Sequence, residues 1–390
     1  MNLESIKSIL TLRYDYTQKP ILPKISYNDF EKKQDFSSDD IERKLLKNLV
    51  QKIPNEYTEP ISISLSGGID STLMLILLKK LFPNNQINAI SIKFQDSIDE
   101  TEIASKIAKK IGVSHHVIEV ENFLEKLNEA ISITKLPFWD IHWIYVVENA
   151  KNYSNFLVSG DGGDELFGGY IFRYSKFLEK INHDISTYEK INLYLSCHER
   201  DFVPEQREIF TKKMNFKWND IHKQLFPFFN NSLTPIEQIF LADYNGKLLY
   251  NFSIINSALA KKFNINNVTP FLSSDLILDS MKIPASSKYD SKSNFGKLLL
   301  RKILKKYQLD DLISQQKLGF SVNTENLWKN HGYELVSKFL LDGQTIQDGW
   351  INNDWVKTNL NNRKIDVRHI NKFFGLLAFE IWYRKFCNNN

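Results

Sequence analysis

The segment ISISLSGGIDST, residues 61–72, joins a strand pattern to a helix pattern through two glycines. Residues 61–65 alternate and are rich in β-branched side chains, which predicts a strand, and the apolar residues 72–81 predict a helix that covers a sheet. Gly67 and Gly68 allow positive φ angles and let a ligand approach the backbone closely. Because N–H groups converge where a strand turns into a helix N-terminus, the segment predicts a phosphate-binding site.

Asp70 narrows the kind of phosphate site that we expect. A carboxylate repels a bare phosphate, so the sensible role of Asp70 is to hold a Mg²⁺ ion that bridges the phosphates of a nucleotide. The same residues also allow a simpler reading, in which the glycines form an ordinary turn and Asp70 or Ser71 caps the helix. The segment has neither the G-x-x-x-x-G-K-S/T pattern of a Walker loop nor a Rossmann fingerprint.

A second glycine-rich segment, VSGDGGDELFGG at residues 158–169, follows another short strand pattern at residues 155–158. Its three carboxylates, Asp161, Asp164 and Glu165, would repel one another unless a cation lay nearby. We therefore expect the two glycine-rich segments to form the two sides of one nucleotide site.

Both segments resemble known motifs. Residues 66–71 resemble the PP-loop of the N-type ATP pyrophosphatases, which cleave ATP between the α and β phosphates, and residues 158–169 closely resemble the synthetase domain of the asparagine synthetase family. The sequences PFL at 270–272, GKLLLR at 296–301 and KLGF at 317–320 resemble further elements of that family. The resemblance implies an α/β fold of the adenine nucleotide alpha hydrolase-like type, with ATP and Mg²⁺ as cofactors.

The resemblance also implies which residues form the nucleotide site. The residues implied to bind ATP are Leu65, Ser66, Gly67, Gly68, Asp70, Ser71, Ile92, Ser159, Gly160 and Gly162. The residues implied to hold Mg²⁺ are Asp70 and Asp164.

Two further residues are candidates for catalysis. Lys317 alone would be an ordinary surface lysine, but the resemblance implies that it stabilises the negative charge that develops on the α-phosphate and later on the acyl carbonyl. Asp161 either assists deprotonation of the nucleophile or only orders its loop. Lys297 and Arg301 lie one helical turn apart and could simply belong to a solvated face.

The function implied by the resemblance is an ATP-dependent amide ligase that forms AMP and pyrophosphate. It would activate a small carboxylate as an acyl-adenylate, which ammonia or an amine then attacks. An intramolecular amide cyclase, closing a β-lactam or a peptide macrolactam, is an alternative. A tRNA-modifying PP-loop enzyme is a third reading, but it requires a basic stripe, paired cysteines and a nucleic-acid module, none of which the sequence shows.

The substrate itself stays open at this point. The family usually reads Arg-x-Pro-Phe-Leu-Asp near its acceptor pocket, and this chain has Val268 and Ser273 at the two charged positions. Loss of both members of a charge pair changes a pocket more readily than it prevents folding. These departures put aspartate as the acceptor in doubt.

The order of strand and helix patterns along the sequence predicts that the chain has three parts. Residues 1–40 read as a leader or linker, a remnant of the junction with the glutaminase domain that family members carry. Residues 41–180 alternate strand and helix patterns, which predicts a parallel sheet covered by helices on both faces. Residues 181–390 turn helical and aromatic without clear strands, and we expect them to complete the acceptor site. The family's glutaminase nucleophile is a cysteine at position 2, where this chain has Asn2, so we expect no glutaminase here.

Composition limits the classes of partner. The 390 residues are 42% hydrophobic and carry a formal net charge of +4, which suits anionic small substrates and is too weak to indicate nucleic acid. The two cysteines show no metal-ligand spacing, and no apolar stretch predicts a signal peptide or a membrane span. We therefore expect a cytoplasmic protein, to which a separate glutaminase or a carrier protein could deliver a substrate.

Overall fold

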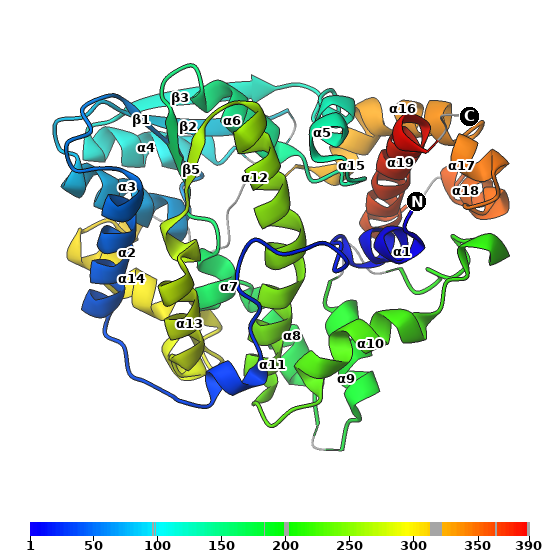
Figure 1. The fold of residues 1–390 in the computed structure, drawn as a ribbon, viewed down its shortest axis with the longest axis horizontal. Helices are drawn as coiled ribbons and strands as arrows, with labels where there is room; N and C mark the ends of the chain where they lie inside the picture. The colour runs from blue at the N-terminus through cyan, green and yellow to red at the C-terminus, as the bar shows by residue number, and fades with distance from the viewer. Residues whose placement is uncertain are drawn as a thin grey trace.

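Five parallel strands form the central sheet of the molecule (Figure 1). The structure is a computed structural model that describes residues 1–95, 97, 99–182, 184–198, 203–312, 322–362 and 365–387. The strands are β1 (Ile61–Ser64), β2 (Ile87–Phe94), β3 (Ser114–Val120), β4 (Phe156–Val158) and β5 (Asn266–Val268), in the order β3-β2-β1-β4-β5. β1 and β2 are almost wholly buried, which confirms the expectation of a parallel sheet covered by helices.

Helices cover this sheet in layers. They are α2 (Ser38–Lys52), α3 (Ile69–Leu81), α4 (Thr101–Ile111), α6 (His142–Ala150), α12 (Ser253–Lys262) and α14 (Leu298–Lys306). Right-handed crossovers put α3 and α4 on one face and α6 on the other, because the strand order reverses between β1 and β4. α12 packs against α6 and β5, and α2 and α14 pack outside α3.

The strand β5 corrects one expectation from the sequence, which predicted no clear strand after residue 180. It pairs in parallel with β4, with Phe156 opposite Asn266 and Val158 opposite Val268. Two of its three residues are asparagines, which are depleted in strands, so the local pattern carried no strand signal. The central sheet therefore combines segments from both halves of the chain.

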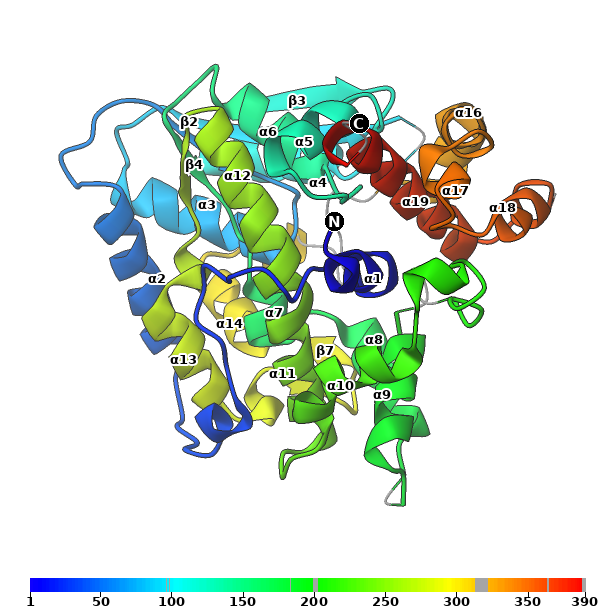
Figure 2. The same cartoon turned by 45° about the vertical axis from the view of Figure 1, so that its right-hand side comes forward.

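The remaining helices surround this unit and extend it to one side (Figure 2). They are α1 (Leu3–Leu12), α5 (Leu127–Thr134), α7 (Gly163–Phe167), α8 (Ile171–Lys180), α9 (Thr187–Ser196), α10 (Trp218–Phe229), α11 (Pro235–Asp243), α13 (Ser274–Lys282), α15 (Thr324–Leu327), α16 (Tyr333–Leu340), α17 (Gln344–Gln347), α18 (Asn353–Leu360) and α19 (Val367–Phe386). A short antiparallel hairpin joins β6 (Tyr289–Asp290) to β7 (Phe295–Gly296). One continuous apolar core runs through the sheet layers and these helices. No helix in the described part of the chain is long and apolar enough to cross a membrane.

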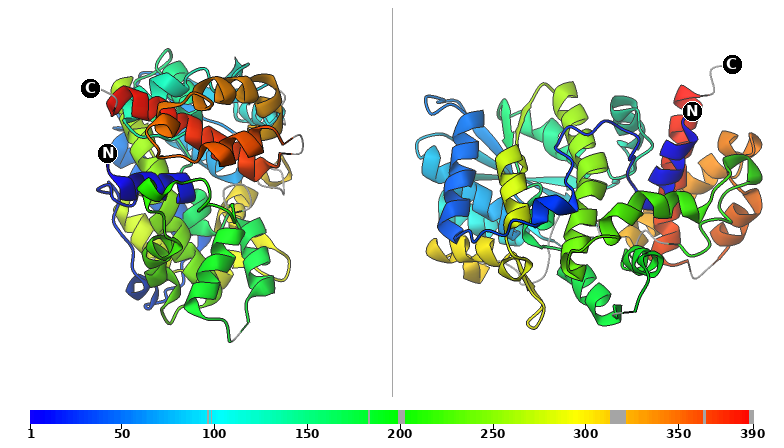
Figure 3. Two further views of the ribbon diagram at one scale, coloured as in Figure 1. Left: turned by 90° about the vertical axis from the view of Figure 1, so that its right-hand side faces the viewer. Right: turned by 60° about the horizontal axis from the view of Figure 1, so that its bottom comes forward.

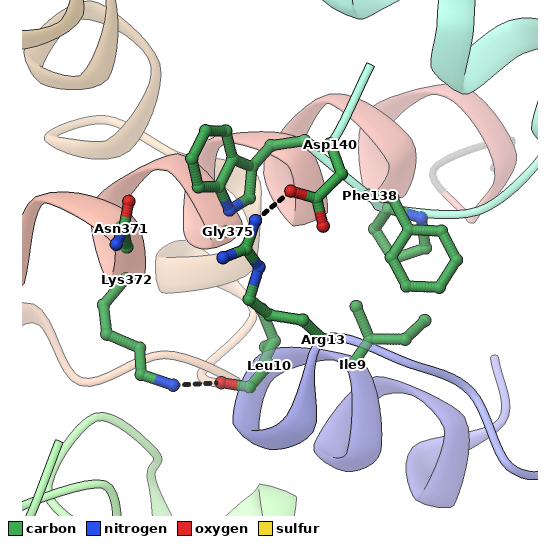
Figure 4. Close-up of a pocket in the computed structure, with 10 residues that line it drawn as sticks. Ile9, Leu10, Arg13, Phe138, Asp140, Asn371, Lys372 and Gly375 are labelled. Carbon is green, nitrogen blue, oxygen red and sulfur yellow. Dashed lines mark hydrogen bonds and ion pairs between the residues drawn. The ribbon is translucent and has the colours of Figure 1, made fainter. Parts of the chain in front are cut away.

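The N-terminal helix α1 packs against the C-terminal helix α19, and both termini lie on the same side of the molecule (Figures 1 and 3). Lys372 of α19 donates a hydrogen bond of 2.7 Å to the carbonyl oxygen of Leu10, near the end of α1. Arg13 forms an ion pair with Asp140 and lies 4.6 Å above the ring of Trp139 (Figure 4). The cavity between these side chains measures about 20 Å³, which is room for about one water molecule. The segment predicted as a leader or linker is thus packed into the fold.

Lys288, just before β6, is a buried cation. Its side chain is 1% exposed, and its Nζ forms no hydrogen bond with any described residue. The ring centroid of Phe240 lies 5.3 Å from Nζ. Burial, reinforced by the nearby charge of Lys33, lowers the pKa of Lys288 to about 7. A buried ammonium without a hydrogen-bond partner destabilises the folded state unless it releases its proton.

We expect Lys288→Met to raise the free energy of unfolding by on the order of 3–5 kcal/mol at neutral or lower pH. The unfolded chain keeps this lysine protonated up to pH 10.5, whereas the folded protein releases the proton above about pH 7. The free energy of unfolding of the wild type therefore rises between about pH 7 and pH 10.5. The difference in stability between the variant and the wild type shrinks over the same range. Urea unfolding of both proteins on either side of pH 7 and near pH 10 measures this. An equal advantage at every pH would contradict the assignment.

Candidate functional site

The two glycine-rich segments follow β1 and β4, which are neighbours in the sheet. The strand order reverses between these two strands, and ligands of open α/β sheets bind beyond the carboxyl ends of the strands at such a point. The segments touch: a Cβ atom built on Gly160 would lie 2.8 Å from Cβ of Asp70 and 2.8 Å from the backbone nitrogen of Ser71. The structure thus brings together the two segments that the sequence analysis paired.

The first segment turns directly from β1 into α3. Gly67 has a φ angle of 74°, in the left-handed region that favours glycine. α3 begins at Ile69, earlier than the sequence pattern indicated, so Asp70 lies in the first turn at the positive end of the helix dipole. The N-cap residue is Gly68, and no side-chain hydrogen bond caps this helix in the structure. Asp70 therefore lies inside the first turn of α3 and is not its N-cap residue.

The second segment turns from β4 into the short helix α7. Gly162 makes the turn with a φ angle of 92°, and α7 carries Asp164 and Glu165. Glu165 is 4% exposed, and its carboxylate accepts a hydrogen bond of 2.6 Å from the hydroxyl of Tyr170. Tyr170 therefore satisfies one of the three carboxylates that the sequence placed in this loop.

Lys297 joins the two segments electrostatically. Its Nζ forms an ion pair with Asp70 and a second one, of 2.7 Å, with Oδ1 of Asp164. The residue is only 9% exposed. Burial disfavours its charge, but the two carboxylates outweigh burial and raise the pKa of the Lys297 ammonium above its usual range. The reading of Lys297 as part of a solvated face is therefore wrong.

Two glycines, Gly163 and Gly169, leave the space that the charged groups of Asp70, Asp164 and Lys297 occupy. A Cβ atom on Gly163 would lie 2.4 Å from Cγ of Asp70, and one on Gly169 would lie 1.8 Å from Oδ1 of Asp164 and 2.6 Å from Cε of Lys297. No side chain fits at these distances. The glycines of the second segment thus allow the two carboxylates and the ammonium to meet.

Asp161 belongs to the same glycine-rich segment as Asp164, and two side chains donate hydrogen bonds to its carboxylate. Its Oδ2 accepts hydrogen bonds of 3.0 Å from Ser159 Oγ and 2.9 Å from Asn256 Nδ2. Burial raises the pKa of Asp161. Asn256 belongs to α12 and was not a candidate in the sequence analysis, because nothing in the local pattern links residues 95 positions apart.

Comparison with known proteins identifies the family to which this chain belongs. Residues 43–384 match the family model for asparagine synthase. The chain belongs to the asparagine synthase family. It is 26% identical over 359 residues to the glutamine-hydrolyzing asparagine synthetase 1 of Bacillus subtilis (strain 168), a match that covers 83% of this chain and 56% of that protein. The chain therefore spans little more than half the length of this relative.

Other relatives match shorter parts of the chain. A putative glutamine-hydrolyzing asparagine synthetase 2 of Methanocaldococcus jannaschii is 31% identical over 134 residues, which cover 33% of this chain and 26% of that protein. Among solved structures, the NH3-dependent NAD synthetase of Campylobacter jejuni aligns with a TM-score of 0.27 and 16% identity, covering 51% of this chain and 99% of that one.

In this member of the asparagine synthase family, the residues predicted to bind ATP lie at the carboxyl ends of three adjacent strands. Leu65 follows β1, Ile92 lies near the end of β2, and Ser159 follows β4. The backbone N–H of Leu65 donates to Ile90, and that of Ser159 donates to Val268 in β5. Hydrogen bonds to neighbouring strands thus hold the backbone of Leu65 and Ser159 at the edge of the site. The roles of the three residues in ATP binding stay predictions.

Two other sequence predictions have different outcomes. Lys317, with the rest of the KLGF sequence, lies outside the described residues. Ser273, at the position of the family's aspartate, accepts a hydrogen bond from Asn48 of α2, which also donates to the carbonyl oxygen of Pro270 at 3.0 Å. Ser273 therefore ties the segment after β5 to α2.

The donor set suits magnesium bound together with a nucleotide. In the described part of the chain, no cluster of three or more His, Cys, Asp or Glu side chains could hold a metal alone. Asp70 and Asp164 do converge on a single cation, the ammonium of Lys297. Mg²⁺ in nucleotide sites takes one or two carboxylates and completes its shell with phosphate oxygens and water. The residues present therefore fit Mg²⁺ as part of Mg·ATP.

Proposed function

We propose that this chain is an ATP-dependent carbon–nitrogen ligase of the asparagine synthetase type, which forms AMP and pyrophosphate. The observation that carries the proposal is the convergence of Asp70, Lys297 and Asp164 between two glycine-rich segments at the switch point of a parallel sheet. Membership of the asparagine synthase family supports it.

The proposed reaction uses the chain in three ways. Backbone N–H groups of residues 66–71 and the dipole of α3 bind the phosphates of ATP. Asp70 and Asp164 would hold Mg²⁺, which would supply charge neutralisation at the phosphates. A substrate carboxylate attacks the α-phosphate and expels pyrophosphate, and ammonia or an amine then attacks the acyl carbon of the adenylate and releases AMP. Lys317 stabilises the negative charge of both steps.

We infer that Asp161 orders the second segment and does not act as a base, because Ser159 and Asn256 both donate to its carboxylate. An asparagine at this position still accepts hydrogen bonds but cannot take a proton. We therefore expect Asp161→Asn to keep its rate of pyrophosphate release within about fivefold of wild type, and Asp161→Ala to lose about tenfold or more. A loss in Asp161→Asn as large as that in Asp161→Ala would assign the base role instead.

Pyrophosphate release from Mg·ATP against a panel of carboxylic acids, with and without ammonium, tests the proposed function. Release with aspartate and ammonium, accompanied by asparagine, identifies asparagine synthesis. Release with another acid assigns a different acceptor, and release with no added amine that is accompanied by a cyclic amide product indicates an intramolecular cyclase. If no acid supports release, while the protein still binds ATP, the proposed ligase activity is wrong.

A further inference from the structure

Lys297 occupies the position between the two carboxylates that the proposed function gives to Mg²⁺. We propose that Lys297 is a built-in counter-ion, which holds Asp70 and Asp164 together in the nucleotide-free protein and excludes free Mg²⁺ until ATP arrives with the metal. The proposal rests on the assignment of these carboxylates as magnesium ligands. It concerns the order in which metal and nucleotide bind.

The backbone of Lys297 is fixed at this place. Its N–H donates a hydrogen bond of 3.1 Å to the carbonyl oxygen of Phe167, at the end of α7. Its φ angle of 58° lies in the left-handed region, which a lysine adopts only when its surroundings impose it. A Cβ atom on the preceding Gly296 would lie 2.1 Å from the carbonyl oxygen of Gly168. The backbone of β7 is therefore packed directly against the end of α7, and these contacts hold the backbone of Lys297 in place.

Charge and distance make the ammonium and the metal compete. The ammonium of Lys297 offsets one of the negative charges of Asp70 and Asp164 in a mostly buried site, and its removal would leave one more negative charge there. Mg²⁺ binds oxygen at about 2.0–2.1 Å and would stand in contact with an ammonium that already touches the same oxygen atoms. Like charges at such a separation repel strongly where water is largely excluded. Free Mg²⁺ must therefore displace Lys297 before it binds.

ATP removes this obstacle because it brings negative charge of its own. The phosphates supply oxygen ligands for the metal and an acceptor for the displaced ammonium, which stays on its four-carbon side chain within the site. Metal and nucleotide then increase each other's affinity, since a coupling between two ligands is reciprocal. Lys297 in this account suppresses binding of the metal alone and contributes to binding of the pair.

Binding of Mn²⁺ in the absence of nucleotide tests the proposal. Electron paramagnetic resonance of free Mn²⁺ gives its affinity for the wild-type protein and for Lys297→Met. We expect weak binding to wild type and binding tighter by at least about tenfold in the variant, because its two carboxylates lose their counter-ion. We also expect Mg²⁺ alone to raise the Tm of Lys297→Met and to leave that of wild type unchanged.

Three further variants serve as controls for the Mn²⁺ measurement. Lys288→Met removes another buried lysine, whose Nζ forms no hydrogen bond with any described residue, and should bind Mn²⁺ as weakly as wild type. Lys297→Arg keeps the counter-ion and should also bind weakly. The double variant Lys297→Met with Asp70→Asn should lose the tight binding again. If Lys297→Met folds only with millimolar Mg²⁺ present, that dependence itself supports the proposal.

Equal Mn²⁺ affinity of wild type and Lys297→Met would overturn the proposal, and so would a gain that persists when Asp70 is also replaced. The measurement does not depend on turnover. A failure of the proposed ligase activity with every acid would leave these binding results unchanged. If Mn²⁺ binds none of the proteins even with ATP present, the metal assignment of Asp70 and Asp164 fails instead.

Discussion

The variants Asp70→Asn and Asp164→Asn should each lose pyrophosphate release by about a thousandfold or more while they remain folded. Asparagine has the size of aspartate, so it fits the space that Gly163 and Gly169 leave. The change removes one of the two carboxylates that converge on the cation position. Loss of metal-assisted charge stabilisation costs several kcal/mol of transition-state free energy, which corresponds to this loss of rate.

The measurement is pyrophosphate release at saturating Mg·ATP, together with a thermal melt that reports folding. A matched control is Asp342→Asn, which makes the same chemical change at an exposed residue between α16 and α17. The control should keep its full rate. Release by Asp70→Asn or Asp164→Asn within about tenfold of wild type would refute the metal assignment, because a magnesium ligand supplies more than that.

The sequence predicted the central features of the fold because the relevant signals are local. Residues 61–64 and 87–94 form β1 and β2, where β-branched and apolar side chains suit a strand buried on both faces. Of the two glycines expected to allow positive φ angles, Gly67 adopts one, whereas Gly68 has a φ angle of −79°. The two glycine-rich segments meet because both follow strands that are neighbours at the switch point of the sheet.

The parts that were missed depend on contacts between distant residues. Lys297 lies 227 positions from Asp70, and in isolation its place beside an amphipathic helix is typical of a solvated residue. The motif that contains Lys297 resembles the family, but spacing alone does not show that its ammonium meets two carboxylates. β5 was missed for a similar reason, since its asparagines form a strand only because β4 offers a free edge. Tertiary pairing decided both cases.

The variant Lys317→Ala should lower the rate constant of turnover by about 100- to 1,000-fold and leave the dissociation constant for Mg·ATP within about threefold of wild type. The expectation comes from chemistry and from the family resemblance, because Lys317 lies outside the described residues. Its proposed partner is charge that exists only while pyrophosphate leaves and while the amine attacks. In the ground state, α3 and Lys297 already provide positive potential for the phosphates.

Turnover and ATP binding must be measured separately to test this split. Lys329→Ala, a change at an exposed lysine in the helical segment that follows, is the matched control and should alter neither quantity. A residue that binds substrate and transition state equally well would lose affinity and leave the saturated rate unchanged. A loss of affinity with an unchanged saturated rate would therefore make Lys317 a ground-state contact. A loss confined to the rate would assign Lys317 to the reacting atoms, whereas Lys297 pairs with the two carboxylates of the site.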